Sequence, residues 1–125
     1  MVDLLEQGSR WLDRQRRKSM AREVVYSRGS ASVTLLATIG RTEFEQTDQY
    51  GVVHRIESRD YLVTAEDLVL DGQLTTPKAG DQIRESDGAA TRVYAVLAPG
   101  DEPPWRWSDP YRVTLRIHTK AVGDE

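Results

Sequence analysis

The sequence has 125 residues and contains no cysteine, one phenylalanine, two methionines and two histidines. Without cysteine there is no disulfide framework, cysteine–zinc site or thiol nucleophile, and the absence slightly favours the cytosol. No apolar run approaches the ~20 residues that a membrane span requires. Asp3 and Glu6 interrupt the short apolar start, which argues against a signal peptide. We therefore expect a soluble protein without a membrane partner.

The remaining composition is that of an ordinary globular protein, with 38% hydrophobic and 30% charged residues. The length predicts one domain over residues 1–125. The net charge of −3 is unevenly spread, because residues 1–28 carry +3 and the remainder carries −6. A basic end on an acidic body indicates docking to an acidic partner, or a solvated helix end whose cations lie at the negative pole of the helix dipole. Both interpretations stay open.

An amphipathic helix is predicted at the N-terminus, within residues 1–20. Asp3, with Glu6 three residues later, fits a capping box, and the helix is expected to run from about Asp3 to about Lys18. Such a helix must lay its apolar face on its own domain or on a neighbouring subunit. The apolar and small residues that share this face are Leu4, Leu5, Gly8, Trp11 and Leu12.

From residue 22 to residue 122 the pattern changes to period two, which is typical of β-strands. Turn signals at Gly29, Gly80 and Gly88 separate the segments, and residues 40–51 and 99–110 are predicted loops. Thr64 is a possible cap for one helical turn before Asp71-Gly72 breaks the chain. We predict a mainly β (α+β) fold: a small antiparallel β-barrel or sandwich of six or seven strands. The predicted strands include residues 24–26, 33–39, 52–56, 60–64, 93–97 and 113–118.

Catalytic and metal-binding patterns are missing. His54 and His118 are 64 positions apart with no cysteine nearby, so we expect a strand-packing and a surface histidine rather than a metal site. The carboxylate clusters lie in loop-like stretches without the apolar setting that separates the pKa values of an acid–base pair. The sequence predicts no enzyme and no cofactor.

The segment from Pro99 to Tyr111 is unusual, because it places Trp105, Arg106 and Trp107 in a long, proline-rich connection. Long loops in compact domains are functional or disordered, and the tryptophans argue against disorder. Tryptophan, tyrosine and arginine are also enriched in binding hot spots. Two interpretations remain: the tryptophans form a plug over the barrel end, or they bind a partner.

The order of these segments resembles the head–tail joining proteins of long-tailed phages, the stopper or head-completion connectors of lambda-like phages and prophages. The resemblance implies a structural subunit of the virion neck, assembled in the host cytoplasm as a homo-oligomeric ring. The ring would contact portal or adaptor and tail-terminator proteins, pass DNA through its channel and help retain it, with loop 40–51 lining or closing that channel. The segments that carry the resemblance are Leu4 to Lys18, Arg55 to Val63, Pro77 to Ile83, Val93 to Val96 and Thr114 to Lys120.

Partner contacts are then expected at two places, the tryptophan-rich segment and the basic part of the helix. The alternative function is a monomeric β-barrel module that binds a peptide, a nucleic acid or a small ligand. The residues expected to bind partners are Trp105, Arg106, Trp107, Tyr111, Arg14, Arg17 and Lys18.

Overall fold

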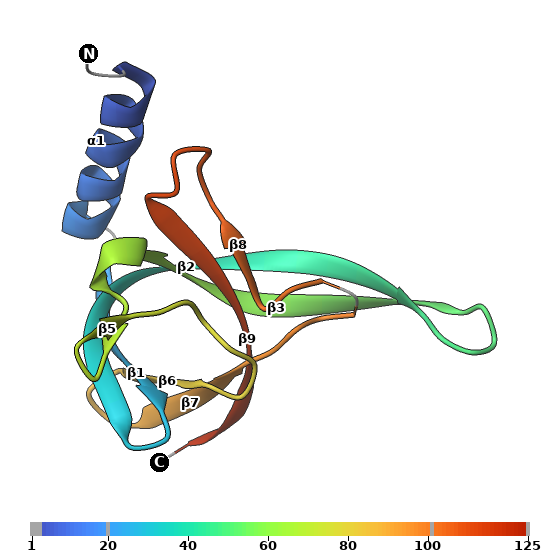
Figure 1. The fold of residues 1–125 in the computed structure, drawn as a ribbon. Helices are drawn as coiled ribbons and strands as arrows, with labels where there is room; N and C mark the ends of the chain where they lie inside the picture. Colours follow the sequence, from blue (N-terminus) through green and yellow to red (C-terminus); the bar gives the residue numbers. More distant parts are fainter. Residues whose placement is uncertain (1–3, 20, 101, 125) are drawn as a thin grey trace.

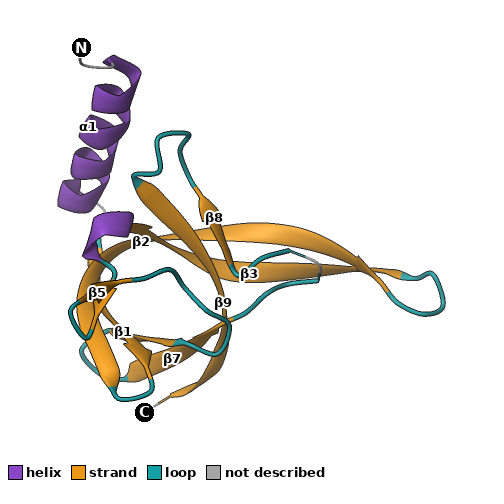
Figure 2. Ribbon diagram, in the orientation of Figure 1, coloured by secondary structure: helices purple, strands orange, loops and turns teal. Residues whose placement is uncertain are grey.

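The computed structural model describes residues 4–19, 21–100 and 102–124, with the side chains of residues 16–19 left out. The predicted mainly β fold with an N-terminal helix is confirmed (Figures 1 and 2). The elements are α1 (Leu4–Ser19), β1 (Arg22–Arg28), β2 (Ala31–Thr47), β3 (Val53–Thr64), η1 (Ala65–Asp67), β4 (Val69–Leu70), β5 (Gln73–Leu74), β6 (Gln82–Ser86), β7 (Thr91–Val96), β8 (Trp105–Trp107) and β9 (Thr114–Asp124).

Seven strands form one antiparallel sheet in the order β3-β2-β1-β6-β7-β9-β8. The C-terminal part of β9 pairs with β7, and its N-terminal part pairs with both β8 and β3. Because β3 and β9 are hydrogen-bonded, the strand order returns on itself and the sheet curls into a barrel-like body (Figure 1). β4 and β5 form a separate small hairpin beside it.

The core lies inside this curled sheet and follows from the period-two pattern of the strands. In β1, Val24 and Tyr26 are buried while Val25 between them is exposed. The core consists of Val24, Tyr26, Leu35, Ala37, Tyr61, Val63, Leu68, Leu70, Ile83, Tyr94, Val96, Leu115 and Ile117.

The ambiguous stretch after Thr64 is one turn of 3₁₀ helix, η1, although the Thr64 side chain does not cap it. The following break at Asp71-Gly72 is the two-residue turn of the β4–β5 hairpin. Both residues have positive φ, 52° and 76°, as a type I′ turn requires, and this is the conformation that an Asp-Gly pair favours.

The predicted loop 40–51 is wrong for most of its length. β2 continues to Thr47, and β3 runs without a break through residues 57–59, where a turn was expected. The two strands stay paired from Ala37↔Val63 to Thr47↔Val53 and project from the barrel-like body (Figure 1). We call residues 41–58 the arm. The arm was not predicted as two long strands because polar side chains occupy both of its faces. The alternation of apolar and polar residues that indicates a strand is therefore weak.

The predicted loop 99–110 is also partly wrong, because it contains β8. Its three residues pair with β9, with Trp105 opposite Ile117 and Trp107 opposite Leu115. A three-residue strand inside a proline-rich connection is too short for a periodic pattern to reveal it.

Candidate assembly interface

Helix α1 is attached to the body by its polar side. The buried carboxylate of Asp13 accepts hydrogen bonds from the hydroxyls of Thr64, at 2.8 Å, and Thr114, at 3.1 Å. One turn earlier, Arg10 donates to Glu66 of η1 at 3.2 Å. These contacts fix which side of the helix faces the body.

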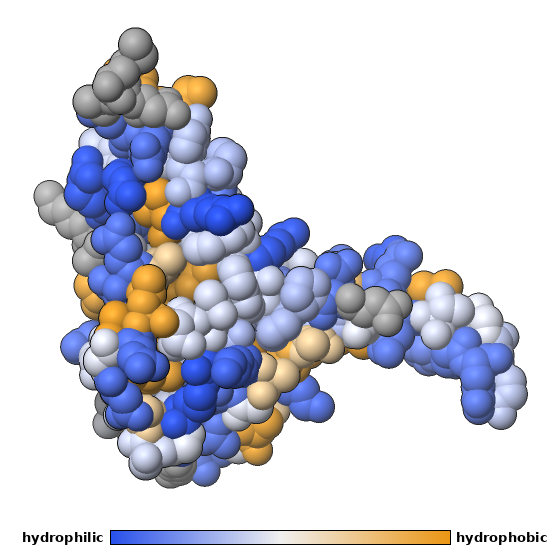
Figure 3. Space-filling model, viewed as in Figure 1, coloured by the Kyte–Doolittle hydropathy of each residue, from blue (hydrophilic) through white to orange (hydrophobic). Residues whose placement is uncertain are grey.

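The apolar stripe of α1 therefore faces solvent. Leu4 is 79% exposed, Trp11 53% and Leu12 62%. Each helical residue turns the chain by about 100°, which places Asp13 on a different side of α1 from Leu4 and Trp11. Figure 3 shows apolar surface on the outer end of this helix, which stands away from the barrel-like body. The helix predicted from the sequence is thus present, and Leu4, Trp11 and Leu12 on its apolar face are exposed in the described part of the chain.

The basic residues expected to bind partners lie on the same helix. Arg14 is exposed. Arg17 and Lys18 belong to α1, but their side chains lie outside the described residues.

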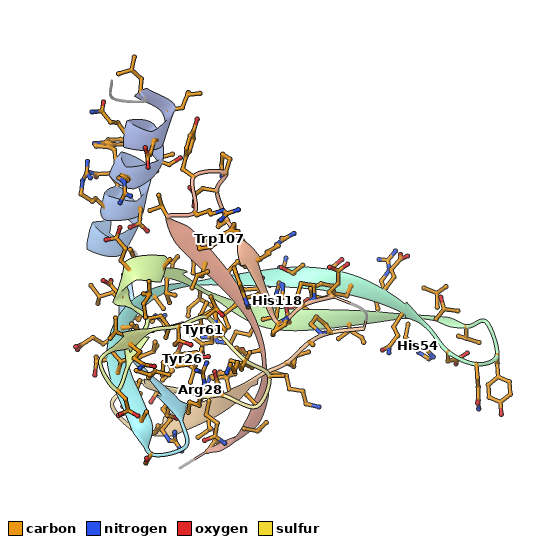
Figure 4. The ribbon with its side chains drawn as sticks, in the orientation of Figure 1. Tyr26, Arg28, His54, Tyr61, Trp107 and His118 are labelled. Atoms are coloured by element: carbon orange, nitrogen blue, oxygen red, sulfur yellow. The ribbon has the colours of Figure 1, made fainter. Side chains whose placement is uncertain are left out.

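The tip of the arm is the second exposed apolar surface. Tyr50 is 82% exposed, and Val52 and Val53 are also exposed. Asp48 shapes the tip by accepting hydrogen bonds from the backbone N–H groups of Tyr50 and Val52. Its second oxygen lies 2.9 Å from Nε2 of His54, an exposed side chain on the arm (Figure 4). His54 is therefore a surface residue of the tip, and its prediction as a strand-packing histidine was wrong.

A buried polar cluster lies where the arm leaves the body. Its centre is Asp60, which is 0% exposed. The carboxylate accepts hydrogen bonds from Ser58 Oγ at 2.6 Å, from Arg116 Nη1 at 2.7 Å and from the Thr42 hydroxyl. Nδ1 of His118 lies 2.9 Å from the same carboxylate. The cluster joins β2, β3 and β9 at the root of the arm.

Two further residues complete this arm-root cluster. The ring of Phe44 meets the imidazole of His118 edge to face, with the centroids 5.0 Å apart. Gly40 leaves room for the guanidinium, because a Cβ at this position would lie 3.3 Å from Arg116 Nη1. His118 is buried, so its prediction as a surface residue was wrong (Figure 4). His118 lies on the face of β9 that points away from the core. The sequence did not show that this face is also buried.

Burial alone would raise the pKa of Asp60, but hydrogen bonds from His118, Ser58, Thr42 and Arg116 outweigh it and hold the pKa well below the usual range. The carboxylate therefore stays ionised. Asp60 is not one of the loop-like carboxylate clusters considered in the sequence, and its buried setting was not visible there.

A second buried carboxylate, Asp81, fastens the body itself. It follows the Pro77-to-Gly80 turn and accepts hydrogen bonds from the Tyr26 hydroxyl, from Nε of Arg28 at 3.0 Å and from the Lys78 N–H at 3.0 Å (Figure 4). Burial acts to raise the pKa of Asp81, but these donors, Arg28 first, lower it overall. Burial, with the hydrogen bond to Asp81, raises the pKa of the Tyr26 phenol.

The tryptophan-rich segment has two faces. Trp105 and Trp107 are half-buried, pack against the core and meet edge to face with centroids 5.1 Å apart. Arg106 points to the opposite side of β8 and is exposed. Tyr111 is half-buried in the turn that follows, where the Asp109 carboxylate accepts its backbone N–H at 3.0 Å. The structure brings these four residues together in one projection, separate from Arg14 on α1.

Among the described residues, no group of three histidine, aspartate or glutamate side chains is arranged to hold a metal ion. The described helices include none that is long and apolar enough to cross a membrane. The exposed features described above are the stripe of α1, the arm and the β8 projection.

The comparison with protein families matches residues 2–125 to the model described as phage head-tail joining protein. The chain belongs to the phage head-tail joining protein family. A search of curated proteins finds no match. Membership covers nearly the whole chain, confirms the resemblance found in the sequence and indicates a structural connector role at the junction of phage head and tail.

Proposed function

We propose that this chain is a neck subunit that assembles into a homo-oligomeric ring between the portal and the tail and helps to retain packaged DNA, without catalysis or a cofactor. Family membership supports the connector role, and the exposed surfaces support assembly. In this proposal the ring contacts portal or adaptor proteins on one side and tail-terminator proteins on the other. DNA meets it only by passing through the channel.

The arm is the observation that carries this proposal. At about 3.3 Å per residue, the stretch from Arg41 to Thr47 reaches roughly 20 Å from the body. Such a projection adds little to the core of a monomer, yet the buried cluster around Asp60 holds its root firmly. A rigidly held projection in each subunit of a ring is suited to lining or narrowing a central channel.

The β8 projection is the proposed contact with the next ring of the neck. Arg106 and Tyr111 supply its accessible polar groups, and Trp105 and Trp107 support them from the core side. Because the tryptophans fix the backbone before binding, docking costs little conformational entropy.

The test is an arm of reduced length. Glu45 and Arg55 face each other across the arm, so residues 46–54 are replaced by Asn-Gly, which forms a two-residue hairpin turn and keeps the register. We expect rings to form as in wild type, whereas filled heads lose their DNA, measured as nuclease-sensitive DNA in particles from a complementation assay. Gln49→Ala, at the exposed tip, leaves the arm length unchanged and is the control. Normal yields of infectious particles with the short arm would contradict the channel role.

A monomeric binding module is the second candidate, and one observation favours it. A groove of about 510 Å³ lies at the root of the arm, between β2, β3, β7 and β9. Its lining includes Arg41 and Lys120 beside Tyr94, together with Glu57 and with Arg59, which is paired with Glu85. Arg41, Lys120 and Tyr94 suit a ligand with an anionic group and an apolar body. A chain that stays monomeric at every concentration and in the presence of portal protein would favour this function over the connector.

A further inference from the structure

The apolar stripe of α1 contains a shallow, open hollow whose lining includes Gly8, and a Cβ built at Gly8 would meet nothing within 4 Å. The hollow has a volume of about 520 Å³, and its lining residues are Leu4, Gln7, Gly8, Arg10, Trp11 and Arg14. A glycine in the interior of an exposed helix weakens the helix, so this position is suited to receiving a side chain from outside.

The stripe cannot be covered by the body of its own chain in this arrangement. Asp13, on the opposite side of the helix from Leu4, is bound to Thr64 and Thr114, and Arg10, at the border of the stripe, is bound to Glu66. Turning the stripe inward would break these contacts and take the Asp13 carboxylate away from the hydroxyls of Thr64 and Thr114. A partner for the stripe is therefore to be sought on another molecule.

A complementary surface lies elsewhere on the same chain. A groove of about 440 Å³ opens beside β5 and is lined by Ala65, Leu74, Thr75, Thr76, Trp107 and Leu115. Leu74 is exposed at its rim and projects a large apolar side chain into solvent. Figure 3 shows apolar surface over β5, below the helix.

Exposed charges of opposite sign lie beside the two surfaces. Arg14 is exposed next to the hollow of α1, and Asp71 is exposed in the turn that precedes β5. Arg28, which donates hydrogen bonds to Thr75 and Thr76 of the groove, is itself paired with Asp81. Over the whole chain, residues 1–28 carry +3 against −6 in the remainder. A molecule that carries an exposed apolar stripe on a basic element and an exposed apolar groove on an acidic body is complementary to itself in a head-to-tail arrangement.

We propose that the stripe of α1 docks on the β5 groove of a second copy of this chain, with Leu74 of that copy seated in the hollow at Gly8. This inference rests on the proposed ring and assigns the surfaces that form it. The contact is heterologous, since different surfaces of the two copies meet, and a heterologous contact generates a ring when its rotation closes.

The first test fills the hollow. Gly8→Leu places a large side chain where Leu74 is expected to dock, and it improves helix propensity, so lost association cannot be attributed to a lost helix. We expect Gly8→Leu to weaken self-association at least tenfold in sedimentation velocity, whereas the matched control Gly8→Ala associates as wild type does. Equal association of the two variants would overturn the docking proposal, and so would a wild-type chain that never associates.

The second test identifies which surfaces meet, and it uses the absence of cysteine from the sequence. Leu4→Cys and Leu74→Cys chains of different tag length are mixed and oxidised. We expect the mixed disulfide dimer to exceed both homodimers at least fivefold. The exposed turn position Ala89→Cys replaces Leu74→Cys in the control mixture. Dominant Leu4→Cys homodimers would show that two stripes pair with each other, which contradicts the proposal.

The two proposals fail in different ways. Rings seen by electron microscopy for Gly8→Leu would reject the stripe-and-groove contact and leave the connector function standing. Suppose instead that Gly8→Leu forms no rings and yet restores infectivity when it complements a phage that lacks this protein. That result would reject the connector function.

Discussion

The barrel-like body and the two elements that project from it, α1 and the arm, place their side chains in opposite ways. The body encloses a core of large apolar residues, although Leu36, Leu74 and Val122 stay exposed on it. Among the described residues, no buried side-chain nitrogen or oxygen lacks a hydrogen-bond partner. The projections expose Leu4, Trp11 and Tyr50 and are attached through polar contacts at Asp13 and Asp60. This difference shows that most of the residues that stabilise the monomer are buried in the body, whereas different residues, on the projections, are available for assembly.

The largest expected effect is at the root of the arm. Asp60→Ala leaves Arg116 and His118 without their buried partner, and we expect it to lower the free energy of unfolding by about 3–5 kcal/mol, as when one member of a buried ion pair is removed. Urea unfolding measures the change. His54→Ala removes the exposed contact with Asp48 at the tip of the same arm and serves as the control, with little or no effect on the free energy of unfolding expected. Equal effects of the two variants would mean that the root is not buried in solution.

The next effect separates the two faces of β8. Trp107→Ala removes a half-buried ring from the edge of the core, and we expect a loss of roughly 2–3 kcal/mol, less than for a fully buried tryptophan. Arg106→Ala, one residue away on the exposed face, is expected to change stability by about 0.5 kcal/mol at most. Thermal melts compare the two. A folded, assembly-deficient Trp107→Ala chain of unchanged stability would show that the tryptophan is purely an interface residue.

Acid is expected to weaken the contacts that Asp60 makes at the root of the arm and those that Asp81 makes in the body. Asp60 and Asp81 have lowered pKa values in the folded chain, so they add stability above the ordinary aspartate pKa of about 3.9 and lose it as pH falls below that value. We expect the urea midpoint to fall with pH below about 4, and Asp81→Asn to make that fall shallower. A midpoint independent of pH between about 5 and 2 would contradict the assigned shifts.

The smallest expected effect on stability is at α1. Trp11 is exposed, so Trp11→Ala should change the free energy of unfolding by less than about 1 kcal/mol, whereas self-association weakens if the stripe is an interface. The melting temperature and the sedimentation profile of one preparation give both quantities. A large loss of stability would place the ring of Trp11 against its own body.

The sequence predicted the elements that its periodicity and turn chemistry specify. α1, β1 and the Asp71-Gly72 turn lie where the apolar spacing and the Asp-Gly pair placed them. Residues 41–47 of the arm were missed because they are largely polar on both faces, and β8 was missed because it has three residues, whereas the returning strand of the arm was predicted in part as residues 52–56.

The candidate site was less predictable, because contacts between segments far apart in the sequence decide which of its side chains are buried and which are exposed. The roles of His54 and His118 were exchanged in the sequence interpretation, since nothing local marks the outer face of β9 as buried. Likewise, the exposure of the α1 stripe depends on Asp13 meeting Thr64 and Thr114, 51 and 101 positions away.

The position of β9 has a consequence for how the chain folds. This strand follows all the others, yet it carries the pairings that join β3 to β7 and so complete the sheet. The contact between Asp60 and His118 spans 58 positions, and that between Tyr26 and Asp81 spans 55. Long-range contacts of this kind form late and slow the search for the native state, whereas the β2–β3 hairpin can form locally. During synthesis the arm is therefore free to form before β9 emerges. The sheet of the body is completed afterwards, when β9 pairs with β3 and β7.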